Sequence, residues 1–256
     1  MKPVSISDFT ILAKRAAFLA GEKILEVYNS TDLGITFKED QSPLTLADQA
    51  AHVEIANCLS DSGLPILSEE GAEVPFETRK NWGYYWLVDP LDGTKEFVKR
   101  NGEFTVNIAL IHHGRPLMGV VYVPVLQELY WGLKGGGAWK QFKDKDPIYI
   151  SVKNIEPIQT IVSSRSHSNQ ETEKFLKQYP DAEIINMGSS LKFLLIADGR
   201  AQLCPRFGPT MEWDTAAAHA IVNAAGGSVR DYNTGNDLYY NKEDLLNPWF
   251  VVKSER

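Results

Sequence analysis

The chain has 256 residues, of which 43% are hydrophobic and 23% are charged. This composition is typical of a globular protein, and the length allows one large or two modest domains with a sizeable core. The formal net charge of −7 argues against a nucleic-acid partner, because a nucleic-acid-binding face needs clustered Lys and Arg.

The cysteines and the N-terminal segment indicate the cellular compartment of the protein. Cys58 and Cys204 are far apart and form no CxxC, which favours two ordinary thiols in a reducing compartment. The N-terminal segment carries charges throughout and is typical of an amphipathic helix, not of a signal peptide. No apolar run reaches a membrane-spanning length. We therefore expect a cytoplasmic protein without a transmembrane segment.

The N-terminal half combines helices with an antiparallel meander. Apolar residues at helical spacing predict a long helix from Ile6 to Ile24. Thr45 opens a second helix, whose predicted buried side is Leu46, Ala50, Val53, Ala56 and Leu59. Strands are predicted at 65–67, 84–88, 105–111, 116–123, 128–133 and 148–152. The segment 71–81 has few apolar anchors, which predicts a mobile loop.

After Asn154 the pattern changes to alternating strands and helices. Strands are predicted at 158–163, 183–187 and 201–204, and helices at 170–178, 190–197 and 215–225. Such alternation indicates an α/β half following an α+β half. We therefore expect two domains, residues 1–155 and residues 156–256. The glycine run at 135–137 lacks the Lys-Ser/Thr ending of a P-loop, which favours a turn between strands.

The stretch WLVDPLDGTKEF concentrates chemistry in few residues. Pro90 favours an extended backbone at Asp89, so this aspartate is expected at a strand end. Asp92-Gly93 is a turn signal, and Thr94 can begin a helical turn whose amides suit a phosphate. Alone, the two aspartates fit a structural role in capping and turning equally well. Divalent cations held between them would instead turn a repulsive site into one that attracts phosphate.

Further acidic residues recur at element ends. Glu69 and Glu70 follow a strand, and Asp48 and Asp214 begin helices. Taken singly, each fits a solvated loop, a helix cap or compensation of a helix dipole. Together they form a pattern that can converge on one cleft. Mg²⁺ prefers such carboxylate oxygens together with water.

WLVDPLDGTKEF, with the upstream SEEG and the downstream WDTAAAHAI, resembles the signatures of the inositol monophosphatase superfamily. The resemblance spans nearly the whole chain and implies an αβαβα layered sandwich. It also implies a lithium-sensitive, Mg²⁺-dependent phosphomonoesterase with two or three metal ions. By this resemblance the metal ligands are Glu69, Asp89, Asp92, Asp214 and the carbonyl of Leu91.

The same resemblance assigns catalytic and phosphate-binding roles. Thr94, oriented by Asp48, would help to activate the attacking water beside the Glu69 metal site. Gly93 and Thr94 would hold the phosphate.

Other segments resemble the 3′(2′),5′-bisphosphate nucleotidases, especially bacterial members tied to sulfate assimilation. These segments are SRSH, GSSLKF and PRFGPTMEWDTAA. The resemblance implies hydrolysis of adenosine 3′,5′-bisphosphate to AMP, with the sulfated precursor as a second substrate. It implies nucleotide contacts from His167, Ser189, Lys192, Arg206 and Asp214. Lys and Arg suit a 5′-phosphate that receives no metal.

Four alternatives remain open from the sequence. Lys192 also fits a solvated helix position, and Arg206 also fits a surface ion pair. The nearest functional rival is an inositol monophosphatase or sugar bisphosphatase, and a rival of another class is a non-catalytic nucleotide or metal sensor. The resemblance adds a peripheral association with the cytoplasmic membrane, and no oligomer interface is readable.

Overall fold

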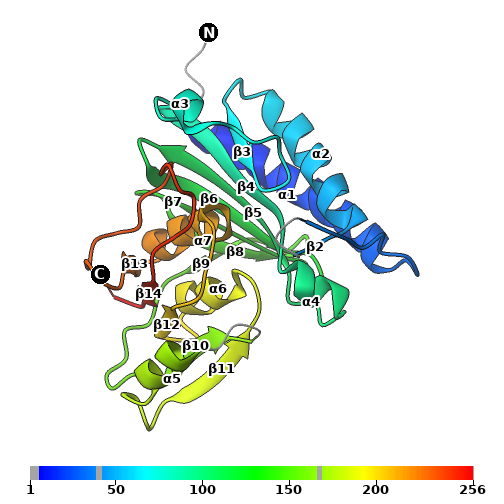
Figure 1. The fold of residues 1–256 in the computed structure, drawn as a ribbon. Helices are drawn as coiled ribbons and strands as arrows, with labels where there is room; N and C mark the ends of the chain where they lie inside the picture. The colour runs from blue at the N-terminus through cyan, green and yellow to red at the C-terminus, as the bar shows by residue number, and fades with distance from the viewer. Residues whose placement is uncertain (1–5, 39–41, 166–168, 256) are drawn as a thin grey trace.

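The computed structural model describes residues 6–38, 42–165 and 169–255. Its elements stack as five layers in the order helices, sheet, helices, sheet, helix (Figure 1). This is the αβαβα sandwich that the family resemblance implies. Within the described residues, no helix is long and apolar enough to cross a membrane.

The first layer consists of α1 (Ile6–Tyr28) and α2 (Leu46–Ser60). The predicted long first helix is confirmed. The predicted buried side of α2 is confirmed at Leu59 and wrong at Leu46 and Val53, which are exposed. The buried residues of α2 are Ala47, Asp48, Ala51, Ile55 and Leu59. The buried face of α2 includes Asp48, because the carboxylate of this residue is hydrogen-bonded inside the protein instead of facing water.

The second layer is a seven-stranded sheet in the order β3-β4-β5-β6-β7-β8-β9, in which only β3 and β4 are parallel. The strands are β3 (Ile66–Ser68), β4 (Tyr84–Asp92), β5 (Thr105–His112), β6 (Arg115–Val123), β7 (Glu128–Leu133), β8 (Gly137–Phe142) and β9 (Ile148–Ile150). The predicted meander is confirmed. The sequence prediction missed β8, which directly follows the predicted glycine turn and begins with Gly137.

The fourth layer is a five-stranded sheet in the order β11-β10-β12-β14-β13. Its strands are β10 (Thr160–Ser164), β11 (Glu183–Met187), β12 (Leu203–Arg206), β13 (Ser228–Asp231) and β14 (Phe250–Lys253). The prediction missed β13 and β14, and β12 lies two residues later than expected. Both missed strands are four residues long, which is too short for a clear period of two.

The third layer lies between the sheets and holds α6 (Leu191–Ala197) and α7 (Glu212–Ala224), while α5 (Gln170–Leu176) covers the outer face of the small sheet (Figure 1). One hydrophobic cluster joins Val121 of the large sheet, Ile221 of α7 and Val252 of the small sheet. The helix predicted to begin at Thr215 begins three residues earlier, so Asp214 lies within its first turn. The division into domains at residue 155 stays a prediction.

The remaining elements are short: β1 (Thr36–Phe37), β2 (Pro43–Leu44), α3 (Phe76–Arg79) and α4 (Thr94–Val98). The segment 71–81 contains α3 and has a strong anchor. The guanidinium of Arg79 is buried and donates to Asn241 Oδ1 at 2.9 Å, Lys242 O at 2.6 Å and Glu243 O at 2.9 Å. This anchor is a charged side chain, which a search for apolar anchors does not detect, and the mobility of the segment stays a prediction.

Helix α7 approaches the large sheet so closely that β6 needs a glycine. A Cβ on Gly119 would lie 2.0 Å from the backbone oxygen of Ala217. We therefore expect Gly119→Ala to shift α7 and lower the free energy of unfolding by about 1–3 kcal/mol, as overpacking does. Urea unfolding measures the change. The control is Gly83→Ala, whose Cβ would meet only His113 at 3.7 Å; equal stability of the two variants would contradict this packing.

Candidate active site

A bulge in β4 aims two aspartates at the same side of the sheet. Residues three apart in a regular strand point to opposite faces. In β4, however, Asp89 pairs with Asn107 and Asp92 pairs with Thr105, so two residues of β4 oppose one of β5. Such a bulge re-aims side chains. Both carboxylates therefore face α7, and β4 continues to Asp92 instead of ending at the predicted Asp89.

The residues of the bulge explain why it forms here. Pro90 has no amide proton to donate to the ladder, and prolines within sheets concentrate at bulges. The Leu91 amide donates instead to Asp89 Oδ1 at 3.0 Å. Gly93 then adopts a φ of 94°, where a Cβ would lie 2.9 Å from the backbone oxygen of Glu103. The turn after Asp92 therefore requires glycine, and α4 begins at Thr94 as predicted.

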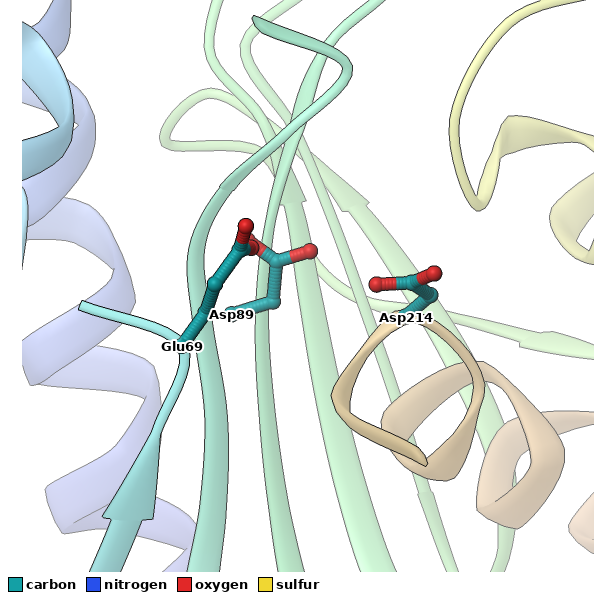
Figure 2. A group of neighbouring side chains, drawn as sticks. All are labelled: Glu69, Asp89 and Asp214. Carbon is teal, nitrogen blue, oxygen red and sulfur yellow. The ribbon is translucent and has the colours of Figure 1, made fainter. Parts of the chain in front are cut away.

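Glu69, Asp89 and Asp214 form an acidic cluster from three separate elements. Figure 2 shows Glu69 just after β3, Asp89 on β4 and Asp214 on the first turn of α7. One carboxylate oxygen from each lies within 4.8 Å of the others. This arrangement could hold a metal ion. Oxygen donors of this kind suit a hard divalent cation, so the donor set fits Mg²⁺.

Two of the acidic residues occupy the same helical position. Asp48 in α2 and Asp214 in α7 are each the third residue of their helix, and each accepts the amide three residues earlier. The distances are 2.7 Å from Thr45 N to Asp48 Oδ2 and 2.8 Å from Met211 N to Asp214 Oδ2. The capping role is therefore present, and it leaves the other oxygen of each carboxylate for a further contact.

Asp48 also contacts Thr94 across the site. Thr94 Oγ1 lies 3.1 Å from Asp48 Oδ1 and 3.2 Å from the Leu91 carbonyl oxygen. Burial raises the pKa of Asp48 to about 6, although hydrogen bonds from Thr45 and Thr94 work in the opposite direction. The Asp48–Thr94 pair that the resemblance implies is thus formed in the structure.

Negative charge accumulates in this site. Burial, followed by the charges of Glu69, Asp92 and Asp214, holds the pKa of Asp89 well above its usual range. Burial, followed by Asp92 and Glu69, does the same for the pKa of Asp214. Carboxylates this close cannot all ionise without a compensating cation.

Lys38 supplies part of that compensation and is absent from the sequence prediction. Its Nζ lies 2.8 Å from Glu69 Oε1 and 2.5 Å from Glu70 Oε1. These two charges help to raise the pKa of Lys38 against the opposing effect of burial. No sequence signal could identify it, because a lone lysine 31 residues before Glu69 forms no motif.

Asp92 is held by a polar network that the sequence prediction also missed. Its Oδ2 accepts from Ser190 N at 2.6 Å and from Asn107 Nδ2 at 3.3 Å. Ser190 Oγ in turn lies 2.9 Å from Asn107 Oδ1 and 2.8 Å from Thr105 Oγ1. A signal for Asn107 existed, since it is a polar residue inside the apolar run TVNIALI.

A cavity extends from Asp214 of the acidic cluster toward the small sheet, without Glu69 or Asp89 in its lining. Its lining includes Asp92, Asp214, Ser189, Lys192 and Arg206. These predicted metal and nucleotide residues therefore share one space. His167 lies outside the described residues.

Lys192 and Arg206 form the cationic side of this cavity. Lys192 is 7% exposed, so the alternative of a solvated helix residue is wrong. Its ammonium donates to Ser189 O at 2.5 Å, and burial followed by Arg206 lowers its pKa. Arg206 donates to Pro209 O at 3.1 Å and has no carboxylate within ion-pair distance in the described part of the chain. The alternative of a surface ion pair is therefore wrong as well.

An αβαβα sandwich with an acidic cluster of this kind is typical of a class of metal-dependent phosphatases. Residues 5–254 match the model of the inositol monophosphatase family. Two curated relatives are the 3′(2′),5′-bisphosphate nucleotidases CysQ of Shigella flexneri and Escherichia coli K12. Each is 49% identical over 237 residues, which cover 91% of this chain and 94% of the relative.

A solved structure agrees with these relatives. The crystal structure of CysQ from Bacteroides thetaiotaomicron superimposes with a TM-score of 0.86 and 45% identity, covering 96% of this chain and 97% of that one. The chain therefore belongs to the inositol monophosphatase family.

The raised carboxyl pKa values predict a pH dependence of the metal-free protein. A carboxyl group whose folded-state pKa exceeds its unfolded value binds protons more readily when folded, so stability is lost as pH rises. For Asp48 the window runs from 3.8 to about 6, and for Asp89 and Asp214 it extends upward from 3.8. We expect the melting temperature without metal to fall from about pH 5 to about pH 7.5.

Two matched measurements separate this effect from other titrations. Mg²⁺ should raise the melting temperature most at the higher pH, because it replaces the bound protons. Asp89→Asn should flatten the pH dependence of the metal-free protein. The same slope in the variant and the wild type would exclude the acidic cluster as its origin.

Proposed function

We propose that this chain is a Mg²⁺-dependent 3′(2′),5′-bisphosphate nucleotidase that hydrolyses adenosine 3′,5′-bisphosphate to AMP and phosphate. One observation carries the proposal: Asp92 and Asp214 line the same cavity as the buried Lys192 and the half-buried Arg206. A substrate with two phosphates matches that division, because one phosphate needs metal and the other needs cationic side chains. The two 49% identical relatives are 3′(2′),5′-bisphosphate nucleotidases, which supports the same activity.

Two or three Mg²⁺ ions are proposed for the acidic side. Glu69, Asp89, Asp214, Asp92 and the Leu91 carbonyl would hold them. When bound, the ions supply a hydroxide from water at neutral pH and neutralise the charge on the leaving 3′-oxygen. The ammonium of Lys38, which now contacts Glu69, is a local cation that this binding would displace or rearrange.

The residues around the cluster orient the reactants. Thr94 Oγ1 has two acceptors within reach, Asp48 Oδ1 and the Leu91 carbonyl, and a hydroxyl donates to one at a time. When it donates to Asp48, its lone pairs can accept from the attacking water. An ionised Asp48 fixes this orientation. The amides of Gly93 and Thr94 would contact the equatorial oxygens of the 3′-phosphate.

Lys192 and Arg206 would bind the 5′-phosphate. Both already lie beside Asp92, since each lowers the pKa of that carboxyl against the larger, opposite effect of burial. Charge-assisted hydrogen bonds to phosphate are about twice as strong as neutral ones. Ser189, with a φ of 44°, bends the backbone between the two sides of the cavity. His167 is proposed as a further nucleotide contact on the resemblance alone.

A substrate panel tests the proposed function. Phosphate release with Mg²⁺ would be measured from adenosine 3′,5′-bisphosphate, its sulfated precursor, inositol 1-phosphate and AMP. The proposal expects a strong preference for the bisphosphate, with AMP as product. A preference for inositol 1-phosphate would keep the metal site and reject the nucleotide assignment. Binding without release from any substrate would favour the non-catalytic sensor.

Asp92→Asn tests the metal site with little change in shape. The neutral amide can still accept from Ser190 N but ligates a hard cation poorly. We expect turnover to fall at least about a hundredfold with the melting temperature of the metal-free protein retained. Asp181→Asn, at an exposed turn, is the control. Near-wild-type turnover in the Asp92 variant would contradict its assignment as a ligand.

Lys192→Met tests recognition of the second phosphate. Methionine keeps an unbranched apolar stem in the buried position and removes the charge. We expect the KM for adenosine 3′,5′-bisphosphate to rise about tenfold or more, and the KM for a simple monophosphate to change far less. The control is Lys177→Met, on the exposed end of α5. Equal changes for both substrates would remove Lys192 from the 5′-phosphate site.

We also infer a cytoplasmic location. Cys58 and Cys204 are both free, which supports a reducing compartment.

A further inference from the structure

A second cavity lies at the other end of α7. It has a volume of about 780 Å³ and is bounded by the start of β6, the turn before β8, the last turns of α7 and the start of β13. Its lining includes Asn223, nine residues after Asp214 in the same helix. At 1.5 Å per residue this separates the two positions by about 14 Å along the axis. The cavity is therefore distinct from the acidic cluster, and its size suits a small organic ligand.

The cavity has a cationic lining in an acidic protein. Arg115, Lys134 and Arg230 contribute to it, against a single carboxylate from Asp237. That carboxylate lies 3.8 Å from Arg230, and both side chains are about half exposed. In the described part of the chain, no carboxylate lies within ion-pair distance of Arg115 or Lys134. The local charge is therefore positive.

Arg115 is held in a fixed orientation. Its guanidinium Nη1 donates to the backbone oxygens of Asp237 at 3.3 Å and Leu238 at 3.2 Å. It also lies over the ring of Tyr239, with 5.7 Å between Cζ and the ring centroid. These neutral contacts position the charge without cancelling it. The remaining guanidinium hydrogens can form the paired bonds that Arg makes with oxyanions.

A buried histidine lies at the wall of this cavity. His219 is fully buried and its Nδ1 contacts Tyr240 Oη at 2.8 Å, while its Nε2 has no hydrogen-bond partner among the described residues. Burial, followed by the charge of Arg115, lowers the pKa of His219 to about 3, so the ring stays neutral. A buried polar atom without a partner is uncommon in folded proteins.

The glycine turn completes the wall. Gly135 and Gly137 both contribute to the lining and both have positive φ, of 78° and 79°. A Cβ on Gly135 would meet nothing within 4 Å, so its backbone borders open space. Tyr149 adds an aromatic surface beside Gly137. Next to Lys134, the cavity wall therefore consists of exposed backbone of the glycine turn and the apolar ring of Tyr149.

We propose that this cavity is a second ligand site, which binds a small organic oxyanion. Arg115, Lys134 and Arg230 would contact its phosphate or carboxylate group, and Tyr149 its apolar part. The site does not depend on the proposed phosphatase activity, because it shares no lining residue with the acidic cluster.

Binding of two probes to the metal-free protein tests the proposal. Inorganic sulfate represents a tetrahedral oxyanion, and succinate represents a carboxylate. Titration calorimetry would give affinity, and the ring ¹⁵N signals of His219, assigned with a His219→Asn variant, would locate the site. We expect at least one probe to saturate and to shift the His219 signals. A response to one probe only identifies the preferred oxyanion.

Matched variants complete the test. The double variant Lys134→Gln and Arg230→Gln should weaken probe binding about tenfold or more at this site. Arg206→Gln, in the other cavity, should leave the His219 response unchanged. Unshifted His219 signals with both probes, or equal affinity in the double variant and the wild type, would overturn the proposal.

Discussion

The fold holds several carboxylates close together in the active site, although their negative charges repel one another. Oxygens of Glu69, Asp89 and Asp214 lie within 4.8 Å of one another, and Asp89 is fully buried. Removal from water and mutual repulsion both raise the pKa values of Asp89 and Asp214. A fold retains such an arrangement at a cost in stability, which cations offset. The way in which the carboxylates are buried therefore favours the binding of a cation among them.

Several local features exist to bring these groups together. The bulge at Pro90 and Leu91 turns Asp89 and Asp92 to one face of β4. Gly119 lets α7 pack closely against β6, which brings the start of that helix over the same face. The first turns of α2 and α7 orient Asp48 and Asp214 through their capping bonds. A capping role for Asp48 and Asp214 is therefore compatible with the site roles proposed for them.

Much of this could be predicted from local sequence, and the rest depended on contacts that local sequence does not encode. WLVDPLDGT specifies a strand, a turn and two carboxylates within a few residues, so Asp89, Gly93 and Thr94 were predictable. The strand end was misjudged at Asp89 because a bulge depends on the register with β5. Lys38 was missed because its partners are distant in sequence. The buried side of α2 was wrong because Asp48 has internal partners, which hydrophobic spacing ignores.

Whether the acidic cluster binds metal can be measured in crystals soaked in Mn²⁺. Anomalous scattering from such crystals would locate the ion. We expect an anomalous peak among Glu69, Asp89 and Asp214, a further peak beside Asp92, and displacement of Lys38 from Glu69. Mn²⁺ found only at other sites, with the Lys38–Glu69 ion pair intact, would contradict this expectation.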